Sequence, residues 1–459
     1  MADLAALFFA WIMAVVISTW FDRALGSDWF PLTTLGGTVF TVMAVLVVIG
    51  LAAGGQYVRR AAYWEEVRVV WRYAAMGALM NFALNFFVQV SYTRTLLLLA
   101  WVFVFVNVPF ARLAARELLI LADHWKRKAI VVGDGENAAE ACDAMRRERH
   151  MGIEVVGRIG RHSAAPQFAG IAVHDPDAGV EQVAQRLGCE VIVLALGGRW
   201  QAQVADVISR LHEQKFEVFV VPALQGLPVH SMQAQHFFSN DVLFLRLQYK
   251  LFSRWSQLLK RSFDVVAAAA MLGALSPLMA FVAWRIWRED GSPVFYTQQR
   301  VGVDGQDFEF IKFRSMVRGA DAMVAEWKLK EPALYERYQS GNFKLADDPR
   351  LLKVGGWIRR SSIDELPQLW NVLRGDMSLV GPRPLLRREL PRYPEQAMAL
   401  YSQVRPGITG LWQVSGRSHT TFEQRAAYDG WYVRNWSLWV DWVILLKTVR
   451  VVISGRGAM

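Results

Sequence analysis

Long uncharged stretches alternate with polar loops at the start of the chain. Four of them, at Leu4–Phe21, Trp29–Val58, Tyr73–Thr93 and Thr95–Ala111, contain no charged residue. Each is close to the ~20 residues that an α-helix needs to cross the hydrocarbon core of a bilayer. The pattern therefore predicts a membrane α-helical bundle, with four transmembrane helices in residues 1–118.

Basic residues are shared unequally between the loops that join these stretches. The loop after the second stretch and the segment after the fourth are rich in arginine and lysine, whereas the other two loops hold only Arg23 and Arg94. Basic loops stay in the cytoplasm. We therefore expect both chain termini on the cytoplasmic side of a bacterial inner membrane. A transport pathway normally needs ionisable residues, so these helices indicate an anchor rather than a transporter.

The pattern changes from about Lys126. Strand-like runs, of which Lys128–Val132 is the first, alternate with amphipathic helical segments. This alternation predicts a doubly wound parallel sheet, and so an α/β Rossmann-like cytoplasmic domain at residues 119–250. The segment Gly133–Gly135 follows the first strand. It is a weak dinucleotide-binding fingerprint, and the same glycines also suit a tight turn that binds nothing.

An apolar run from Val265 to Trp284 follows a boundary near residue 250. It is long enough to span a membrane, but Ser276-Pro277 lies at its middle, where proline breaks the helical hydrogen-bond ladder. Both flanks are basic, so both ends should prefer the cytoplasmic face. The run therefore predicts a re-entrant helix at about 263–287, with the serine hydroxyl helping to satisfy the broken backbone. A kinked transmembrane helix is the alternative.

Composition narrows the classes of function. The chain has 459 residues, 53% of them hydrophobic, a formal net charge of +10 and 19 Trp. A basic protein can bind nucleic acid, anionic lipid or a phosphorylated substrate. Because Trp is enriched at membrane interfaces, we expect the bilayer and not nucleic acid as a partner. The amphipathic stretch Tyr432–Val452 suits a helix in the headgroup region, or else a surface helix with buried Trp.

The segment around Asp364 is the most informative for chemistry. Pro367 suits the first turn of a helix, which would place Asp364 and Glu365 at the helix N-terminus. Such a terminus favours anions and lowers the pKa of a carboxyl group. An ionised Asp364 could attack phosphorus or hold Mg²⁺. The same residues also fit a capping box formed by Ser362 and Glu365.

Several cationic side chains of this half of the chain follow strand-like segments or stand on turns fixed by proline and glycine. Phosphoryl transfer is catalysed mainly by positioning and charge neutralisation, which rigid arginines and a metal ion provide. A carboxylate pair among such cations therefore suits a diphosphate and a metal. The cations in question are Lys312, Arg314, Arg359, Arg383, Arg405 and Arg417.

These motifs closely resemble the catalytic domain of the monotopic phosphoglycosyl transferases, the bacterial sugar transferase family. The resemblance extends from about residue 260 to the end of the chain. The layout is similar to that of the larger members, especially the undecaprenyl-phosphate galactose phosphotransferase group. The matching strings, in the family's order, are KRSFD (260–264), Ser276-Pro277, QQRVG (298–302), KFRSM (312–316), RRSSIDELPQLWNVLRGDMSLVGPRP (359–384) and RPGITGLWQVSGR (405–417).

The resemblance implies an α+β catalytic domain at residues 251–459 on the cytoplasmic face of the bilayer. It implies that Asp364, with Glu365 as its partner, attacks the sugar-bearing phosphate of a UDP-hexose, releases UMP and passes the sugar phosphate to undecaprenyl phosphate. The hexose would be galactose, or else glucose. The family needs Mg²⁺, for which Asp364 would be a ligand.

The resemblance also implies roles for individual residues outside the carboxylate pair. Arg359 and Arg383 match arginines of the family that bind phosphate or form its Pro-Arg-Pro turn, and Gln298 and Arg300 lie in the matching QQRVG string. The residues matched to the membrane face and the lipid phosphate are Lys260, Arg261, Ser276 and Pro277.

Two other classes of function compete with this interpretation. A membrane-anchored, NAD-dependent nucleotide-sugar dehydratase or epimerase would use the glycine turn, but such enzymes usually need a Tyr followed four residues later by Lys. None of the 12 Tyr here has that spacing. A scaffold or sensor would leave the cluster at 359–417 without a role. A homodimer is expected, although no motif fixes it.

Overall fold

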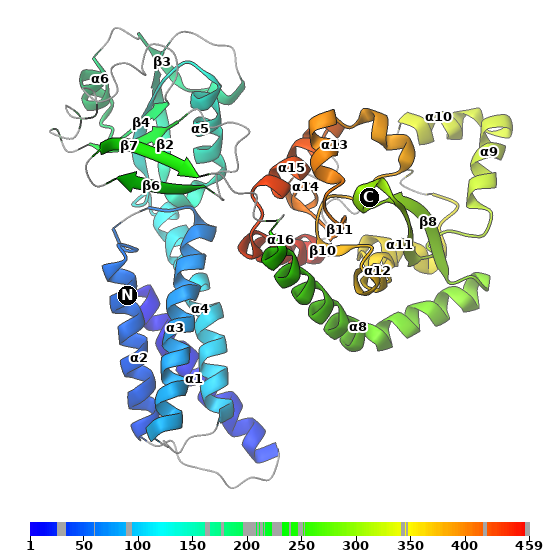
Figure 1. Ribbon diagram of the computed structural model, residues 1–459, viewed down its shortest axis with the longest axis horizontal. Helices are drawn as coiled ribbons and strands as arrows, with labels where there is room; N and C mark the ends of the chain where they lie inside the picture. Colours follow the sequence, from blue (N-terminus) through cyan, green and yellow to red (C-terminus); the bar gives the residue numbers. More distant parts are fainter. Residues whose placement is uncertain are drawn as a thin grey trace. The chain divides into compact units, whose positions relative to one another are not determined.

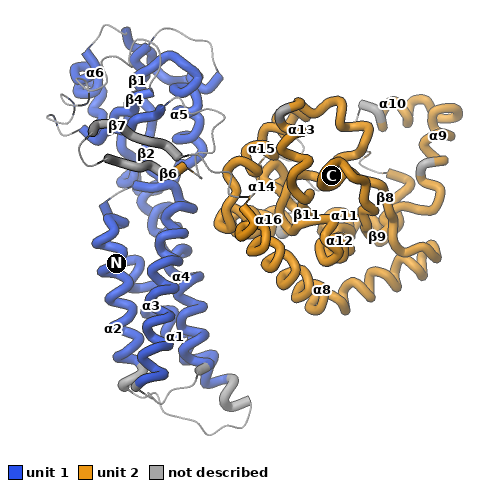
Figure 2. The backbone as a smooth tube through the Cα atoms, viewed as in Figure 1, with its two compact units in different colours: residues 1–225 blue, residues 226–459 orange. Residues whose placement is uncertain are grey.

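Backbone contacts divide the chain into two compact units, Met1–Gln225 and Gly226–Met459 (Figure 2). The first unit contains the N-terminal helices and a parallel sheet. The computed structural model describes residues 1–24, 34–58, 60–88, 94–160, 166–175, 179–195, 208, 211, 214, 216–222, 232–237, 240–246, 251, 253–340, 345, 348–415 and 420–454.

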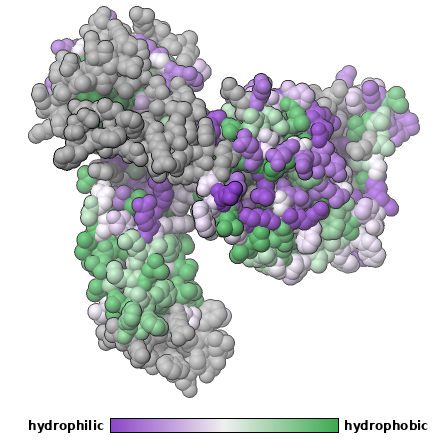
Figure 3. Space-filling view, in the orientation of Figure 1, coloured by the Kyte–Doolittle hydropathy of each residue, from purple (hydrophilic) through white to green (hydrophobic). Residues whose placement is uncertain are grey.

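Four long helices form a bundle at the start of the first unit (Figure 1). Small buried residues such as Ala10, Ala74 and Ala100 let the helix backbones approach closely. Figure 3 shows hydrophobic surface around the bundle. Within the described residues, three helices are long and apolar enough to cross a membrane: α1, α4 and, in the second unit, α8 at Arg254–Asp290. Helix α2 contains a shorter apolar segment. The bounds are α1 Ala2–Ala24, α2 Thr34–Ala53, α3 Tyr63–Val88 and α4 Arg94–Leu121.

A buried network of charges joins three of these helices. Arg112 on α4 donates through Nε to Asp3 on α1 at 2.8 Å and through Nη1 to Glu66 on α3 at 2.6 Å, and Arg116 pairs with Glu66 as well. All four residues lie just outside the uncharged stretches. The network therefore agrees with an apolar anchor, while it fixes the charged ends of the helices to one another.

A parallel sheet follows the bundle, in the strand order β3-β2-β1-β4-β5 of one doubly wound fold. Side chains of the central strand alternate between its faces. Ala129 and Val131 pack with α5, whereas Ile130 and Val132 pack with α6. The predicted parallel α/β sheet is thus present. Its elements are β1 Arg127–Val132, α5 Glu136–Arg147, β2 Ile153–Ile159, β3 Ala172–His174, α6 Val180–Leu187, β4 Val191–Ala195 and β5 Glu217–Val221.

The second unit begins with an antiparallel hairpin and the long helix α8, and it mixes short helices with two further strand pairs. Strands β8 and β9 pair antiparallel, and β10 and β11 pair parallel. The bounds are β6 Gln233–Phe237, β7 Asn240–Arg246, α8 Arg254–Asp290, β8 Phe295–Val301, β9 Asp307–Phe313, α9 Ala320–Lys330, α10 Pro332–Ser340, α11 Lys353–Arg360, α12 Gln368–Arg374, β10 Ser378–Val380, α13 Glu395–Tyr401, β11 Gly407–Thr409, α14 Leu411–Ser415, α15 Phe422–Arg434 and α16 Leu438–Ser454.

Helix α8 is bent near its middle (Figure 1). Pro277 has no N–H for the carbonyl of Gly273, and the Ser276 hydroxyl donates to that carbonyl at 2.8 Å instead. This confirms the expectation that the Ser276 hydroxyl satisfies a backbone group freed by the proline. The two arms pack against different cores, because Ala268 joins the cluster around α12 and Ile286 joins the cluster around α11.

The C-terminal segment differs from the predicted amphipathic stretch. Helix α15 ends at Arg434, and α16 starts only at Leu438. Between them, Trp436 is buried and its indole N–H donates to Asp441 at 3.1 Å, whereas Trp442 on α16 is exposed. The single helix expected over Tyr432–Val452 is therefore wrong, since a buried polar contact interrupts it.

Candidate active site

Asp364 lies in a 3-10 helix, Ile363–Glu365, that joins α11 to α12. The preceding Ser362 has a φ of 56°, a left-handed conformation that is uncommon outside glycine, and it turns the chain sharply at the end of α11. Helix α12 starts only at Gln368, so the expectation that Asp364 stands at its N-terminus is wrong. The capping box is wrong as well, because within this described segment the Ser362 side chain makes no capping bond.

Burial has the largest effect on the pKa of the Asp364 carboxyl. Its residue is only 7% exposed, and this burial raises the pKa of the Asp364 carboxyl, while the nearby charges of Lys312 and Arg359 act in the opposite direction. The predicted lowering of this pKa is therefore wrong, because desolvation outweighs the local charges. Burial likewise lowers the pKa of Lys312, and Asp364 and Glu365 oppose that change. The Asp364 carboxyl and the Lys312 amine thus interact in a poorly hydrated site.

The β8–β9 hairpin supplies the adjoining polar side chains. Lys312 stands opposite Tyr296, and alternation along β8 puts Tyr296, Gln298 and Arg300 on one face. Arg300 donates to the Gln298 side chain at 2.8 Å and to the carbonyl of Pro384 at 3.1 Å. The hairpin thereby links the carboxylate cluster to the Pro-Arg-Pro turn.

That turn is held by a backbone scaffold. Gly381 donates to the carbonyl of Thr409 at 2.9 Å, and Gly407 donates to the carbonyl of Pro382 at 2.8 Å. A Cβ at Gly381 would lie 2.5 Å from the carbonyl oxygen of Arg405, so a larger residue would displace the backbone. The half-buried Arg383 is therefore presented by a turn with little freedom, as the sequence predicts.

The basic pair matched to the membrane face is used inside the second unit. Lys260 is buried, and its Nζ donates to Asp441 at 2.8 Å and to the carbonyl of Val380 at 3.0 Å. Arg261 donates to the carbonyls of Val372 and Leu373 at the C-terminal end of α12. These contacts favour a structural role for both residues over binding of a lipid phosphate.

Two further predicted phosphate ligands, Arg314 and Arg405, also donate to groups of the protein itself. Arg314 donates to Asp290 at 2.8 Å and to the carbonyl of Gly291 at 2.7 Å, which fixes the end of α8. Arg405 is exposed and donates to the carbonyl of Gly375 at 2.8 Å. Arg417 lies outside the described residues. The cations that act on Asp364 are Lys312 and Arg359, and Arg300 acts on Lys312.

Comparison with known proteins decides the family. The model of a family described as bacterial sugar transferase matches residues 255–455. The undecaprenyl-phosphate galactose phosphotransferase of Salmonella typhimurium is 37% identical over 403 residues, which are 88% of this chain and 84% of that protein. The UDP-galactose-lipid carrier transferase of Erwinia amylovora is 35% identical over 409 residues, with the same shares. This chain belongs to the bacterial sugar transferase family.

The relatives of this sugar transferase do not agree on one sugar. The undecaprenyl-phosphate glucose phosphotransferase of Komagataeibacter xylinus is 33% identical over 348 residues, which are 72% of this chain and 60% of that protein. Its name specifies glucose, whereas the other two names specify galactose. The comparisons confirm the resemblance and do not favour a dehydratase or epimerase.

The chemistry of the donor set suits a magnesium ion in this sugar transferase. Mg²⁺ is usually held by one or two carboxylates together with substrate phosphates and water. Asp364 and Glu365 supply two adjacent carboxylates. Among the described residues, no group of three or more His, Cys, Asp or Glu side chains could form an all-protein metal site. The carboxylate pair therefore fits a metal that binds together with a phosphorylated substrate.

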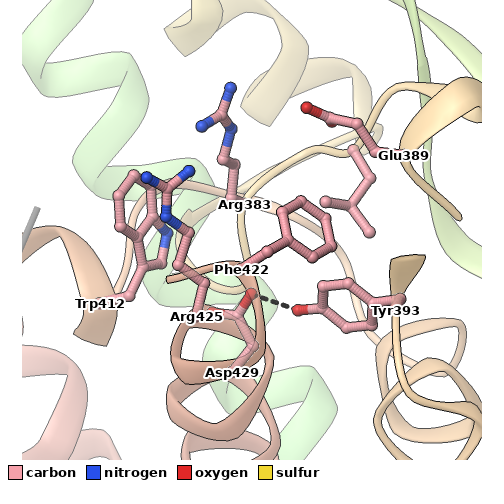
Figure 4. A pocket seen from close by; sticks show the side chains of 8 residues that line it. Arg383, Glu389, Tyr393, Trp412, Phe422, Arg425 and Asp429 are labelled. Carbon is pink, nitrogen blue, oxygen red and sulfur yellow. Dashed lines mark hydrogen bonds between the residues drawn. The ribbon is translucent and has the colours of Figure 1, made fainter. Parts of the chain in front are cut away.

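Sequence reasoning missed a pocket of this sugar transferase between α14, α15 and the Pro-Arg-Pro turn (Figure 4). Arg425 and Asp429 of α15 line it, together with Tyr393 and Trp412. None of these residues except Trp412 lies in the motifs that carry the resemblance. The available signal was Asp429 itself, a carboxylate on the buried face of α15 between Ala426 and Val433.

Proposed function

We propose that this sugar transferase moves a hexose 1-phosphate from a UDP-hexose to undecaprenyl phosphate and releases UMP. Galactose is the proposed hexose and glucose the second candidate, because relatives are named for both. The observation that carries the proposal is the burial of Asp364 beside Lys312 and Arg359. A poorly hydrated carboxylate among fixed cations suits covalent phosphoryl transfer.

In the first step, a carboxylate oxygen of Asp364 attacks the phosphorus that bears the sugar. The bond from this phosphorus to the oxygen bridging to UMP breaks, and UMP leaves with the electron pair. The sugar phosphate then remains on Asp364 as an acyl phosphate. Lys312 and Arg359 stabilise the negative charge that gathers at the phosphorus and its oxygens.

In the second step, a phosphate oxygen of undecaprenyl phosphate attacks the same phosphorus. The bond to Asp364 breaks, and the carboxylate is regenerated. Both nucleophiles are anions, so neither step needs a general base. Two sequential displacements predict ping-pong kinetics.

Asp364 is the proposed magnesium ligand, with Glu365 as its partner. When bound, Mg²⁺ would neutralise the diphosphate and stabilise the UMP leaving group. The chain's own cations bind and orient the phosphates. Arg300 and Arg383 extend the positive charge from the carboxylate pair towards the pocket lined by Arg425 and Asp429.

The proposed location is the cytoplasmic face of the bacterial inner membrane, with α8 as a re-entrant helix. Its bend and its exposed apolar side chains, such as Phe281 and Trp284, support this topology. The lipid phosphate lies at headgroup level and the nucleotide sugar is soluble. A helix that enters and leaves by one face keeps Asp364 near both.

The test is UMP release from a UDP-sugar panel by the full-length protein with Mg²⁺ and undecaprenyl phosphate. Asp364→Ala and Asp364→Asn should each lower the rate at least about 10³-fold, since the nucleophile is lost. Quenched wild-type reactions should carry the sugar phosphate on Asp364. Asp307→Asn, which alters a carboxylate paired with Arg387 on the surface, is the matched control and should keep activity. Substantial turnover by Asp364→Ala would remove the nucleophile assignment.

A further inference from the structure

The missed pocket has two guanidinium groups at its mouth. Figure 4 shows Arg383 and Arg425 on the same side of the pocket, with Asp429 and Tyr393 at its base. The centroid of the Trp412 ring lies 5.7 Å from Cζ of Arg383 and 4.9 Å from Cζ of Arg425. The two cations therefore share one indole, and they come from the Pro-Arg-Pro turn and from α15.

These two arginines repel each other. Burial lowers the pKa of Arg425, and the charge of Arg383 lowers it further. Among the described residues, the Arg383 guanidinium makes no ion pair, and the hydrogen bond of the Arg425 guanidinium goes to the Thr420 hydroxyl at 3.3 Å. Forks of N–H donors held in this way match the geometry of phosphate oxygens.

The nearby carboxylates attract these guanidinium groups, but their hydrogen bonds go elsewhere. Asp429 accepts a hydrogen bond from the Tyr393 hydroxyl at 2.7 Å, and the backbone N–H of Arg383 also bonds to it. Glu389 accepts from the backbone N–H of Leu386 at 2.8 Å. Both carboxylates thus fix the protein around the pocket instead of bridging the two guanidinium groups. Asp429 in particular anchors the backbone that carries Arg383.

A series of neighbouring cations connects the pocket with the Asp364 site. Lys312 interacts electrostatically with Asp364 and Arg300, Arg300 with Arg383, and Arg383 with Arg425. The transfer proposed above needs places for three phosphates, namely the two of the donor and the one of the acceptor. The cations around Asp364 serve the phosphorus under attack.

We propose that Arg383 and Arg425 together form a second phosphate subsite, with Asp429 and Tyr393 as positioning residues. The inference rests on the proposed transfer reaction. The ligand is a phosphate group, supplied either by the nucleotide part of the donor or by the polyprenyl phosphate. Arg425 is thus a substrate-binding residue outside the sequence motifs.

The experiment compares Arg425→Gln, Arg425→Lys and the wild type as full-length protein in nanodiscs. We measure KM for UDP-hexose, KM for undecaprenyl phosphate, and the dissociation constants of UMP and of undecaprenyl phosphate by direct titration. Arg425→Gln should raise one KM and the matching dissociation constant at least about tenfold, because a charge-assisted fork is lost. Arg425→Lys should raise these constants less, because lysine keeps the positive charge although it lacks the forked guanidinium group.

Arg387→Gln is the matched control, since Arg387 is exposed and pairs with Asp307 at the surface. It should change none of these constants. Weaker UMP binding assigns the subsite to the nucleotide, and weaker undecaprenyl phosphate binding assigns it to the acceptor. Unchanged binding of both in the two Arg425 variants overturns the subsite, even if the melting temperature or kcat falls. A wild type that binds UMP but turns over no UDP-hexose would sink the proposed reaction alone, because the titrations still test the subsite.

Discussion

Two buried carboxyl groups in the second unit have different surroundings. Asp364 faces the cations Lys312 and Arg359, which oppose the effect of burial on its pKa. Asp429 is only 3% exposed, and the charges of Arg383 and Arg425 likewise oppose the effect of burial on its pKa, but the side chain that hydrogen bonds to it is the neutral hydroxyl of Tyr393. Burial accordingly raises the pKa of Asp429 to about 7. Asp429 hydrogen bonds to Tyr393 and to the backbone of Arg383, and it is thus arranged to hold a turn.

The pKa of Asp429 predicts a pH-dependent stability. A raised pKa means that the folded chain binds this proton more tightly than the unfolded chain does. Asp429 therefore lowers the free energy of unfolding as the pH rises from the ordinary Asp range to about 7. Asp429→Asn should become more stable relative to the wild type over this interval, by roughly 2–4 kcal/mol. Thermal unfolding of both proteins between about pH 4.5 and 8 measures this difference.

An exposed carboxyl provides the control for this measurement. Asp307→Asn removes a surface carboxyl that pairs with Arg387, and it should lack the gain in stability expected of Asp429→Asn. The amide oxygen introduced by Asp429→Asn can still accept the hydrogen bond from Tyr393, so the substitution changes the titration and keeps the contact. A stability difference that does not vary with pH would contradict a raised pKa at Asp429.

Individual residues show where sequence reasoning reaches its limit. The motifs identify Asp364, Lys312 and Arg359 as a cluster, and the structure brings these residues together. The direction of the Asp364 pKa could not be predicted, because desolvation depends on packing between segments far apart in the chain. Lys260 shows the same limit. Its partner Asp441 is 181 residues away, and no local pattern indicates that the pair is buried.

Helix α8 is the element whose geometry matters most. It has 37 residues, so a straight helix would be about 55 Å long, well beyond the ~30 Å of a hydrocarbon core. The bend at Ser276-Pro277 divides it into two arms. The parts of the two arms inside the expected re-entrant segment, 263–276 and 277–287, are about 21 Å and about 17 Å long, so neither alone crosses the ~30 Å core, which favours entry and exit by one face.

Cysteine labelling tests this topology. Single cysteines at Ser262 and Arg288, on opposite sides of the bend, should both react with an impermeant reagent from the cytoplasmic face. The native Cys142 and Cys189 are buried and should contribute little background. Adding Pro277→Ala restores the missing backbone donor, and the straighter helix should reduce labelling at position 288. Labelling of the two sites from opposite faces in the parent would instead identify α8 as a transmembrane helix.

The other elements were predictable to different degrees. The continuous apolar run at the end of β1, Ala129–Val132, is typical of a parallel sheet, because both faces of its strands are covered. Gly133 has a φ of 144°, and a Cβ there would lie 3.0 Å from Ala195, so the glycine turn needs no nucleotide to explain it. By contrast, the break between α15 and α16 is marked by Asn435, which caps the end of α15, and by Ser437, whose hydroxyl accepts from the N–H of Val440 at 3.2 Å; hydrophobic periodicity does not register either residue.

At the scale of the molecule, motifs in family order predict the family correctly, whereas the boundaries of the parts depend on packing. The compact units divide at residue 225, while composition suggests a boundary near 250. The hydrophobic clusters around α12, α11 and α13 all lie within the second unit, as do Asp364, Lys312 and both proposed phosphate subsites. The family match at 255–455 falls there as well.

A chain of residues 226–459 should therefore fold and catalyse alone. Because its cores and its cations are complete, UMP release in nanodiscs should stay within about tenfold of the full-length rate when both are saturated with lipid, and KM for UDP-hexose should hardly change. The same fragment with Asp364→Asn should be inactive, which separates its activity from contaminants. A fragment that unfolds cooperatively but releases no UMP would show that the bundle or the parallel sheet contributes directly to catalysis. In that case the first unit would take part in the reaction and would be more than an anchor.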